Sequence, residues 1–298
     1  MELRNLTTFL KIVEYNSFSK AAEHLAYSQS TVTIQIQQLE EELNTRLFER
    51  IGKKIFLTAE GEELKYYAQQ IFELTQQISA IGAGEEELKG TLRISSFDSL
   101  ITAILPAILK IYHERYPKVH VTVKTADSIL EAENQLRQNE ADFAFISYDR
   151  RVSKEYEKQF LQKARFVFAA APTHPLTKQE QVSLEEIAKY DVIIMNKQFS
   201  FSELSNEDTK HLGQMITPIF DIWNPIGAME AAKCGIGITL LPEYLMRDAV
   251  NKGELCILNV PELDFIVWLQ TIYHYRKTIT PQMNAFFKLL EEYYDIQT

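Results

Sequence analysis

The stretch that decides the fold of the first part of the chain is FSKAAEHLAYSQSTVTIQIQQLEEEL, residues 18–43. Its paired alanines predict a short helix that a second helix can approach closely, and Ser19 is placed to cap the first turn. Ser28 is placed to cap a longer helix over residues 29–43, whose apolar residues recur at helical spacing. Two such helices joined by a tight turn are typical of a helix-turn-helix.

The residues on either side of this stretch extend the same unit. A preceding helix is predicted by one apolar stripe made of Leu6, Phe9, Leu10 and Val13. Asn44 occupies the position after the longer helix where a left-handed residue is usual. Residues 46–58 hold four basic side chains against one acid, and the four are Arg46, Arg50, Lys53 and Lys54. This cluster suits nucleic-acid phosphates, and its alternative is an ordinary solvated loop.

A long helix is predicted from Ala59 to about Leu88, with Thr58 as its cap. Its apolar residues alternate at spacings of three and four over residues 64–81, and they are Leu64, Tyr67, Ile71, Leu74, Ile78 and Ile81. This seam favours a coiled coil with a second copy, and packing on its own domain is the alternative. Glycines and an acidic run between residues 82 and 90 predict a hinge after the helix.

From residue 91 onward, strand-like and helix-like patterns alternate. The predicted strands cover residues 92–97, 119–125, 142–146, 166–171, 192–195, 216–222, 236–241 and 266–273. The predicted helices cover residues 101–116, 129–138 and 183–189, the last of which opens with a capping box of Ser183 and Glu186. This alternation predicts parallel α/β sheets.

Together these motifs closely resemble the LysR-type transcriptional regulators, and the match is carried by residues 18–25, 28–33, 35–36, 39–40, 47–50 and 57–61. The resemblance implies an α-helical winged helix-turn-helix with a long linker helix, followed by an α/β domain of two subdomains similar to periplasmic binding proteins. The implied parts are residues 1–58 for DNA binding, 59–90 for linker and dimerisation, and 91–298 for effector binding. The first subdomain takes about 91–162 and 268–298, and the second takes about 163–267.

For DNA recognition, the resemblance implies that the longer helix reads bases and the wing touches the backbone of double-stranded promoter DNA. The residues it places there are Ser28, Gln29, Ser30, Thr31, Thr33, Gln35, Arg50, Lys53 and Lys54. Two positions depart from the family pattern. Asn44 replaces the usual glycine and tolerates the same backbone conformation. Ile34 stands where the family commonly has a polar residue, so it either touches a thymine methyl group or packs inward.

For effector binding, the resemblance implies a small molecule in the cleft between the subdomains. The candidate residues are Ser96, Asp98, Ser99, Asp127, Ser128, Ser147, Asn196, Phe199, Ser200, Trp223 and Asn224. Several of them follow predicted strands, where open α/β sheets bind ligands. Helix capping alone is the alternative for Ser99 and Ser128, and core packing is the alternative for the two aromatic residues. In relatives that bind aromatic acids, an arginine after the third strand often meets a carboxylate. Here the third predicted strand is not followed directly by an arginine, so the resemblance favours a polar or weakly charged effector over a strong dianion.

The overall charge bears on the choice of partner. The net charge of −10, from 31 basic and 41 acidic residues, at first argues against nucleic acid. The first 60 residues, however, hold 7 basic and 8 acidic groups, so the acidity lies mostly outside them. We therefore expect modest non-specific affinity for DNA. Binding should depend on base contacts and on two DNA-binding units of a dimer acting together.

The remaining expectations concern rival classes and partners. We find no nucleophile, zinc-ligand or phosphate-loop motif in the sequence, so we expect no enzyme, metal or cofactor. Cys234 and Cys256 are interpreted as buried structural thiols. Without a leader or spanning segment, we expect a cytoplasmic protein with no membrane partner. The expected assembly is a homodimer and a homotetramer, with RNA polymerase as a further candidate partner. The alternative is a cytoplasmic small-molecule-binding protein or an enzyme without DNA-binding activity.

Overall fold

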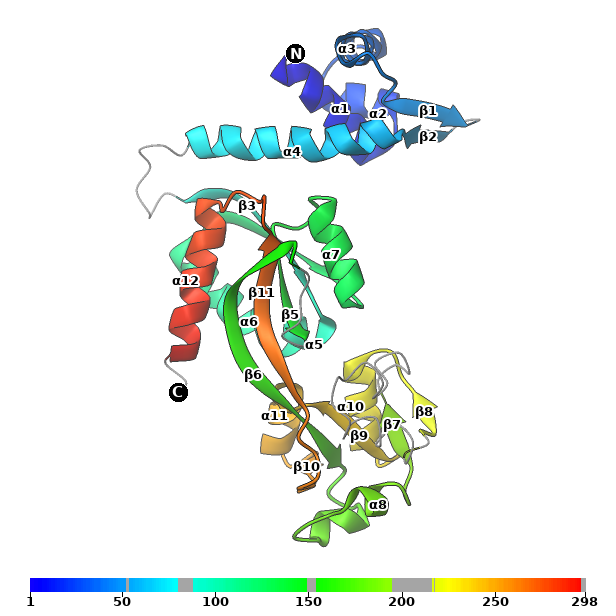
Figure 1. Ribbon diagram of the computed structural model, residues 1–298, viewed down its shortest axis with the longest axis vertical. Helices are drawn as coiled ribbons and strands as arrows, with labels where there is room; N and C mark the ends of the chain where they lie inside the picture. Colours follow the sequence, from blue (N-terminus) through cyan, green and yellow to red (C-terminus); the bar gives the residue numbers. More distant parts are fainter. Residues whose placement is uncertain (52–53, 80–87, 149–153, 195–215, 217, 296–298) are drawn as a thin grey trace. The chain divides into compact units, whose positions relative to one another are not determined.

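The computed structural model describes residues 1–51, 54–79, 88–148, 154–194, 216 and 218–295. The chain divides into two compact units, residues 1–83 and 84–298, which are described separately below. Figure 1 shows the elements of both units, coloured along the sequence.

The first unit packs four helices and a hairpin around one small core. Its helices are α1 (Leu3–Tyr15), α2 (Phe18–His24), α3 (Gln29–Leu43) and α4 (Ala59–Ser79). The antiparallel hairpin is formed by β1 (Phe48–Ile51) and β2 (Lys54–Leu57). Phe9 of α1, Ala21 of α2 and Val32 of α3 are fully buried in the shared core. The helix-turn-helix predicted from the sequence and the wing that the resemblance implies are therefore present.

Side chains at the helix ends explain where these helices begin and end. Ser28 caps α3 by accepting a hydrogen bond from the Thr31 amide at 3.1 Å, and Asn44 adopts the left-handed conformation, as predicted. The cap of α2 was assigned wrongly to Ser19. The helix begins at Phe18, so Ser17 is the capping residue, and Ser19 is the second residue of the helix.

The apolar seam of α4 is divided between the core and the surface. Thr58 caps the helix, accepting from the Gly61 amide at 2.9 Å. Leu64 and Ile71 pack on the core of the first unit. For this part of the seam, the alternative that the helix packs on its own domain is therefore correct. Three further seam residues are 46–65% exposed, and they are Tyr67, Leu74 and Ile78. Residues 80–87, including Ile81, lie outside the described residues, and Leu88, near which the helix was predicted to end, is not helical.

The second unit contains one mixed sheet in the order β4-β3-β5-β11-β6-β9-β7-β8, with β10 paired to β6. Its strands are β3 (Lys89–Ser96), β4 (Lys118–Thr125), β5 (Phe143–Tyr148), β6 (Tyr156–Ala170), β7 (Val192–Ile194), β8 (Phe220–Asp221), β9 (Ile238–Pro242), β10 (Cys256–Ile257) and β11 (Ile266–His274). β3, β4 and β5 pair in parallel, and so do β7, β8 and β9.

The predicted parallel pairing is present within the two groups of strands, whereas β6 and β11 are long antiparallel strands that pair with each other. Figure 1 shows them running side by side from the group of β3, β4 and β5 to the group of β7, β8 and β9. β6 starts at Tyr156, ten residues before the predicted strand, whereas only β8 forms in the predicted strand 216–222. Each group of parallel strands is thus one subdomain, and the two long strands connect them.

Helices cover the sheet of the second unit. They are α5 (Asp98–Ala103), α6 (Leu105–Arg115), α7 (Ile129–Arg137), η2 (Pro175–Lys178), α8 (Leu184–Ile187), α10 (Pro225–Lys233), α11 (Glu243–Asn251) and α12 (Pro281–Asp295). The single helix predicted over 101–116 is two helices, because Pro106, the second residue of α6, has no amide proton to continue α5. The capping box of Ser183 and Glu186 is present at α8.

The two thiols differ from the prediction. Cys234 is exposed and Cys256 is half-buried, so the interpretation as buried structural thiols was wrong. The reason is position, since Cys234 caps the carboxyl end of α10 and Cys256 lies on the short strand β10. Within the described residues, none of the helices combines the length and the apolar character needed to cross a membrane.

Candidate functional site

The first turn of α3 presents a cluster of hydrogen-bonding side chains. The hydroxyl of Ser28 lies 2.7 Å from that of Ser30 and 2.8 Å from that of Thr31. The side-chain oxygen of Gln29 accepts a hydrogen bond from Ser19 of α2 at 3.1 Å. Ser28, Gln29 and Ser30 are all exposed. The cluster is therefore held in place by its own hydrogen bonds while its outer surface is open to a partner.

The two glutamines predicted to bind DNA in α3 have different surroundings. Gln35 is only 8% exposed, and the buried Thr8 hydroxyl donates to its Oε1 atom at 2.7 Å. Gln35 therefore joins α3 to α1, and its assignment as a DNA-contacting residue is corrected here. Ile34 is 53% exposed, so the alternative in which it packs inward is also wrong. The Thr33 hydroxyl donates to the carbonyl of Gln29 at 2.9 Å.

The basic cluster follows α3 in the wing-like hairpin. Arg50 belongs to β1 and Lys54 to β2, where it pairs with Ile51 next to the turn. Lys53 lies outside the described residues. Arg46 is highly exposed, and its guanidinium lies 3.7 Å from Glu40. Because the Arg46 side chain is 84% exposed and the separation is long, the pair is screened by water, and Arg46 remains available to an anionic partner.

In the second unit, four of the predicted effector residues meet around the start of α5. The Ser99 hydroxyl lies 2.9 Å from the hydroxyl of Tyr244, which also donates to Ser147 at 3.3 Å. Burial raises the pKa of Tyr244 above its usual value despite hydrogen bonds with Ser147 and Ser99, so the phenol stays protonated. Tyr244 belongs to α11, so one side chain from the second subdomain bridges two serines of the first.

A second contact joins the subdomains beside this one. The Asn224 side-chain nitrogen donates to Asp98 at 3.0 Å, and its oxygen caps α10 by accepting from the amides of Ile226 and Gly227. Trp223 is 66% exposed next to this contact, so the alternative of core packing was wrong for it. Asp98, Ser99, Ser147 and Asn224 thus form one polar contact between the subdomains.

The other predicted effector residues lie elsewhere. Ser96 is fully buried and donates to the carbonyl of Phe145 at 2.6 Å, which corrects its assignment to the effector site. Asp127 and Ser128 are exposed at the start of α7, where Ser128 caps the helix by accepting from the Glu131 amide at 3.2 Å. Three candidates fall outside the described residues, and they are Asn196, Phe199 and Ser200.

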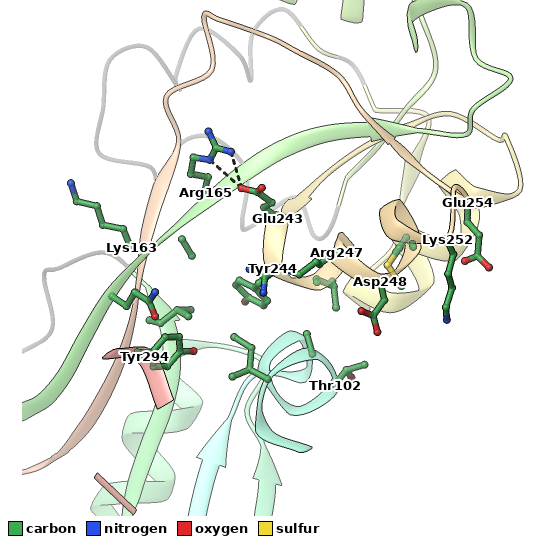
Figure 2. Close-up of a pocket in the computed structure, with 18 of the residues that line it drawn as sticks. Thr102, Lys163, Arg165, Glu243, Tyr244, Arg247, Asp248, Lys252, Glu254 and Tyr294 are labelled. Carbon is green, nitrogen blue, oxygen red and sulfur yellow. Dashed lines mark hydrogen bonds and ion pairs between the residues drawn. The ribbon is translucent and has the colours of Figure 1, made fainter. Parts of the chain in front are cut away.

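A hollow of about 570 Å³ opens at the other end of α5. Figure 2 shows residues around it from α5, β6, α11 and α12, among them Thr102, Lys163, Arg165, Arg247, Asp248 and Tyr294. Arg165 and Glu243 form an ion pair at 2.9 Å on its wall. Of the predicted effector residues that the structure describes, none lines this hollow, although Tyr244 does. Sequence reasoning missed it because its walls come from segments far apart in the chain, and no local pattern marks them.

Each of the two units matches a family model. Residues 3–62 match the model described as "Bacterial regulatory helix-turn-helix protein, lysR family", and residues 85–295 match the "LysR substrate binding domain". The chain belongs to the LysR family of transcriptional regulators. It is a LysR-type regulator with a helix-turn-helix DNA-binding part and an effector-binding domain of two subdomains.

Individual relatives and solved structures cover almost the whole of this LysR-type regulator. It is 31% identical over 289 residues to the HTH-type transcriptional regulator YwqM of Bacillus subtilis, covering 97% of this chain and 98% of the relative. It is 28% identical over 302 residues to CzcR of Bacillus cereus, covering 99% of each.

The solved structures show the same fold. Full-length OxyR of Pseudomonas aeruginosa aligns with a TM-score of 0.70 at 18% identity, covering 98% of this chain and 95% of that one. Full-length CbnR in complex with its target DNA aligns with a TM-score of 0.64 at 19% identity, covering 98% of this chain and 99% of that one. The order of DNA-binding part, linker helix and α/β domain is therefore common to this LysR-type regulator and these proteins.

Proposed function

We propose that this LysR-type regulator reads promoter DNA with the first two turns of α3 and holds the phosphate backbone with its basic hairpin. The observation that supports this proposal is the exposed cluster of Ser28, Gln29 and Ser30, fixed by side-chain hydrogen bonds. A helix start that is rich in hydrogen-bonding groups suits the edges of bases in the major groove. Arg50, Lys53 and Lys54 supply the charge that phosphates require.

Two substitutions test this assignment in titrations of the full chain with a selected operator. Gln29→Ala should relax the preference at one base position by about 1–3 kcal/mol. Lys53→Ala should instead weaken binding to all sequences and reduce the salt slope by about one. Measuring the binding of both variants to matched and mismatched operators at several salt concentrations separates the two roles. An unchanged base preference in Gln29→Ala would show that α3 does not dock in this way.

The effector of this regulator is proposed to be a small, polar or weakly charged molecule that binds at the contact around the start of α5. This proposal is supported by the hydrogen bonds that Tyr244 and Asn224 make across the subdomains. A molecule that replaces or extends these bonds would favour one arrangement of the subdomains over another. Such couplings are typically about 1–3 kcal/mol, enough to change DNA binding several-fold. We assign no cofactor to the site.

The hollow at the other end of α5 is the second candidate, because its volume of about 570 Å³ falls within the usual range for ligand pockets. A thermal-shift screen of polar metabolites with the full chain would first identify an effector. Ser147→Ala should weaken the binding of that effector if it binds at the start of α5. Arg247→Ala, a change confined to the hollow, serves as the matched control. The opposite pattern of effects would place the effector in the hollow.

Self-association is proposed to use the exposed part of the α4 seam, formed by Tyr67, Leu74 and Ile78. Pairing of these residues in a dimer would set two reading heads on two half-sites, and pairs of dimers would give the tetramer. Light scattering of Leu74→Glu should show a smaller assembly than that of the unmodified chain.

A regulator of promoters acts at the chromosome, so we place it in the cytoplasm, with RNA polymerase as a further proposed partner.

A further inference from the structure

Over residues 28–38, the surface of α3 combines polar side chains with one exposed apolar residue, Ile34. Residues 28–38 contain no charged side chain, and the first acid of the helix is Glu40. Ser30, Gln37 and Gln38 are exposed on this surface together with Ile34. Phosphates need cations, so an uncharged surface of this kind is suited to base edges instead.

Ile34 differs from the other β-branched apolar residues of α3. Val32 and Ile36 are 0% and 3% exposed, because they face the core of the first unit, whereas Ile34 is 53% exposed. Residues four apart share one face of a helix, so Ile34 lies between Ser30 and Gln38. A single exposed isoleucine is common on protein surfaces. What distinguishes Ile34 is its place among the hydrogen-bonding groups of the reading surface.

In the major groove, the edges of the bases offer one apolar group, the 5-methyl group of thymine. An isoleucine side chain has no donor or acceptor with which to read any other feature of a base. We propose that Ile34 is a specificity-determining residue that selects thymine through its methyl group, beside the base pair that Ser30 faces. The inference rests on the proposed docking of α3 and adds the identity of one base to it.

The neighbouring residues favour this contact because they are already fixed. The Thr33 hydroxyl donates a hydrogen bond to the carbonyl of Gln29, and the Ser30 hydroxyl shares a hydrogen bond with the Ser28 hydroxyl. The side chains beside Ile34 therefore lose little freedom when a base approaches, and preorganised groups bind with a smaller entropic penalty. Burying one methyl-sized group from water corresponds to about a fourfold change in affinity.

The test removes the methyl group and nothing else. A selection from random duplexes with the full chain first gives an operator, and each thymine in it is then replaced singly by deoxyuridine. We expect one thymine per half-site at which the replacement weakens binding by about fourfold. In Ile34→Ala, the same replacement should have no effect, because the partner of the methyl group is already gone. Ile34→Val should retain part of the effect.

Leu43→Ala provides the matched control, since Leu43 is a 40% exposed apolar residue at the far end of the same helix. This variant should respond to deoxyuridine as the unmodified chain does. If the unmodified chain binds its operator selectively but tolerates every replacement, the assignment of Ile34 is overturned while DNA reading stands. A methyl effect that persists in Ile34→Ala would also overturn it. Failure to select any operator would instead remove the proposed docking of α3. Circular dichroism confirms that each variant is folded.

Discussion

The hydrogen-bonding side chains at the start of α3 and at the start of α5 differ in where their partners lie. In α3, Ser28 contacts Ser30 and Thr31, so the cluster is built from neighbours in the chain and stays open outward. At α5, Ser99 contacts Tyr244, which is 145 residues away. A reading surface can therefore be completed locally, whereas a contact that senses the arrangement of two subdomains needs groups from both.

The strongest test of this difference is a defect in the second unit that leaves the first unit intact. Asp142 is 3% exposed and accepts from the Arg93 guanidinium at 2.7 Å and from the Lys277 ammonium at 3.0 Å. Asp142→Asn removes the charge that both cations contact, and breaking a buried pair costs about 3–5 kcal/mol. Calorimetry should show a lower melting temperature for the second unit and an unchanged transition for the first.

The exposed Asp127 provides the control for this substitution. Asp127→Asn should change the free energy of unfolding by less than about 0.5 kcal/mol, because surface changes are usually small. Loss of both transitions together in Asp142→Asn would contradict the separation of the chain into two units.

The same carboxylate predicts how stability depends on pH. Burial alone would raise the pKa of Asp142, but Lys277 and Arg93 outweigh it and hold the pKa below its usual value. A lowered pKa in the folded state stabilises the protein above the unfolded pKa of about 4, and this contribution is lost as the pH falls further. Urea titrations between about pH 6 and pH 3 should therefore show the second unit losing stability in acid, and Asp142→Asn should reduce that loss.

A smaller effect on stability distinguishes Gln29 from Gln35 in α3. Gln35→Ala leaves the Thr8 hydroxyl buried without the oxygen it donates to, which should lower the free energy of unfolding by about 1–3 kcal/mol. Gln29→Ala, at an exposed position, should change it by less than about 0.5 kcal/mol. Thermal denaturation measures both values. A stable Gln35→Ala variant with altered base preference would return Gln35 to the DNA-contacting set.

The smallest expected change lies at the contact between the subdomains. Tyr244→Phe keeps the ring and removes the hydroxyl shared with Ser99 and Ser147, which should cost about 1 kcal/mol. Tyr275→Phe is the control, because Tyr275 is 49% exposed. The two variants are compared by chemical denaturation and by their DNA binding with and without an identified effector. An unchanged response to the effector in Tyr244→Phe would remove this hydroxyl from the proposed coupling.

The parts of the structure that could be predicted from sequence are those set by neighbouring residues. The cap at Ser28, the left-handed Asn44 and the capping box of α8 each depend on residues a few positions apart. The failures have long-range causes. Gln35 was misassigned because its side chain is polar and its partner, Thr8, is 27 residues away, although its spacing from Val32 and Leu39 places it on the apolar face of α3. β6 was predicted too short because its first half pairs with β11 and lacks a distinct pattern of its own.

The place of β11 in the sheet has a consequence for how the chain is made. This strand lies between β5 and β6, and α12 packs on β3, so the first subdomain is not complete until β11 and α12 have left the ribosome. The helices α1 to α4 require only the first 79 residues. Because domains generally fold in the order of their synthesis, the nascent chain carries a folded DNA-binding unit while its effector-binding domain is still incomplete.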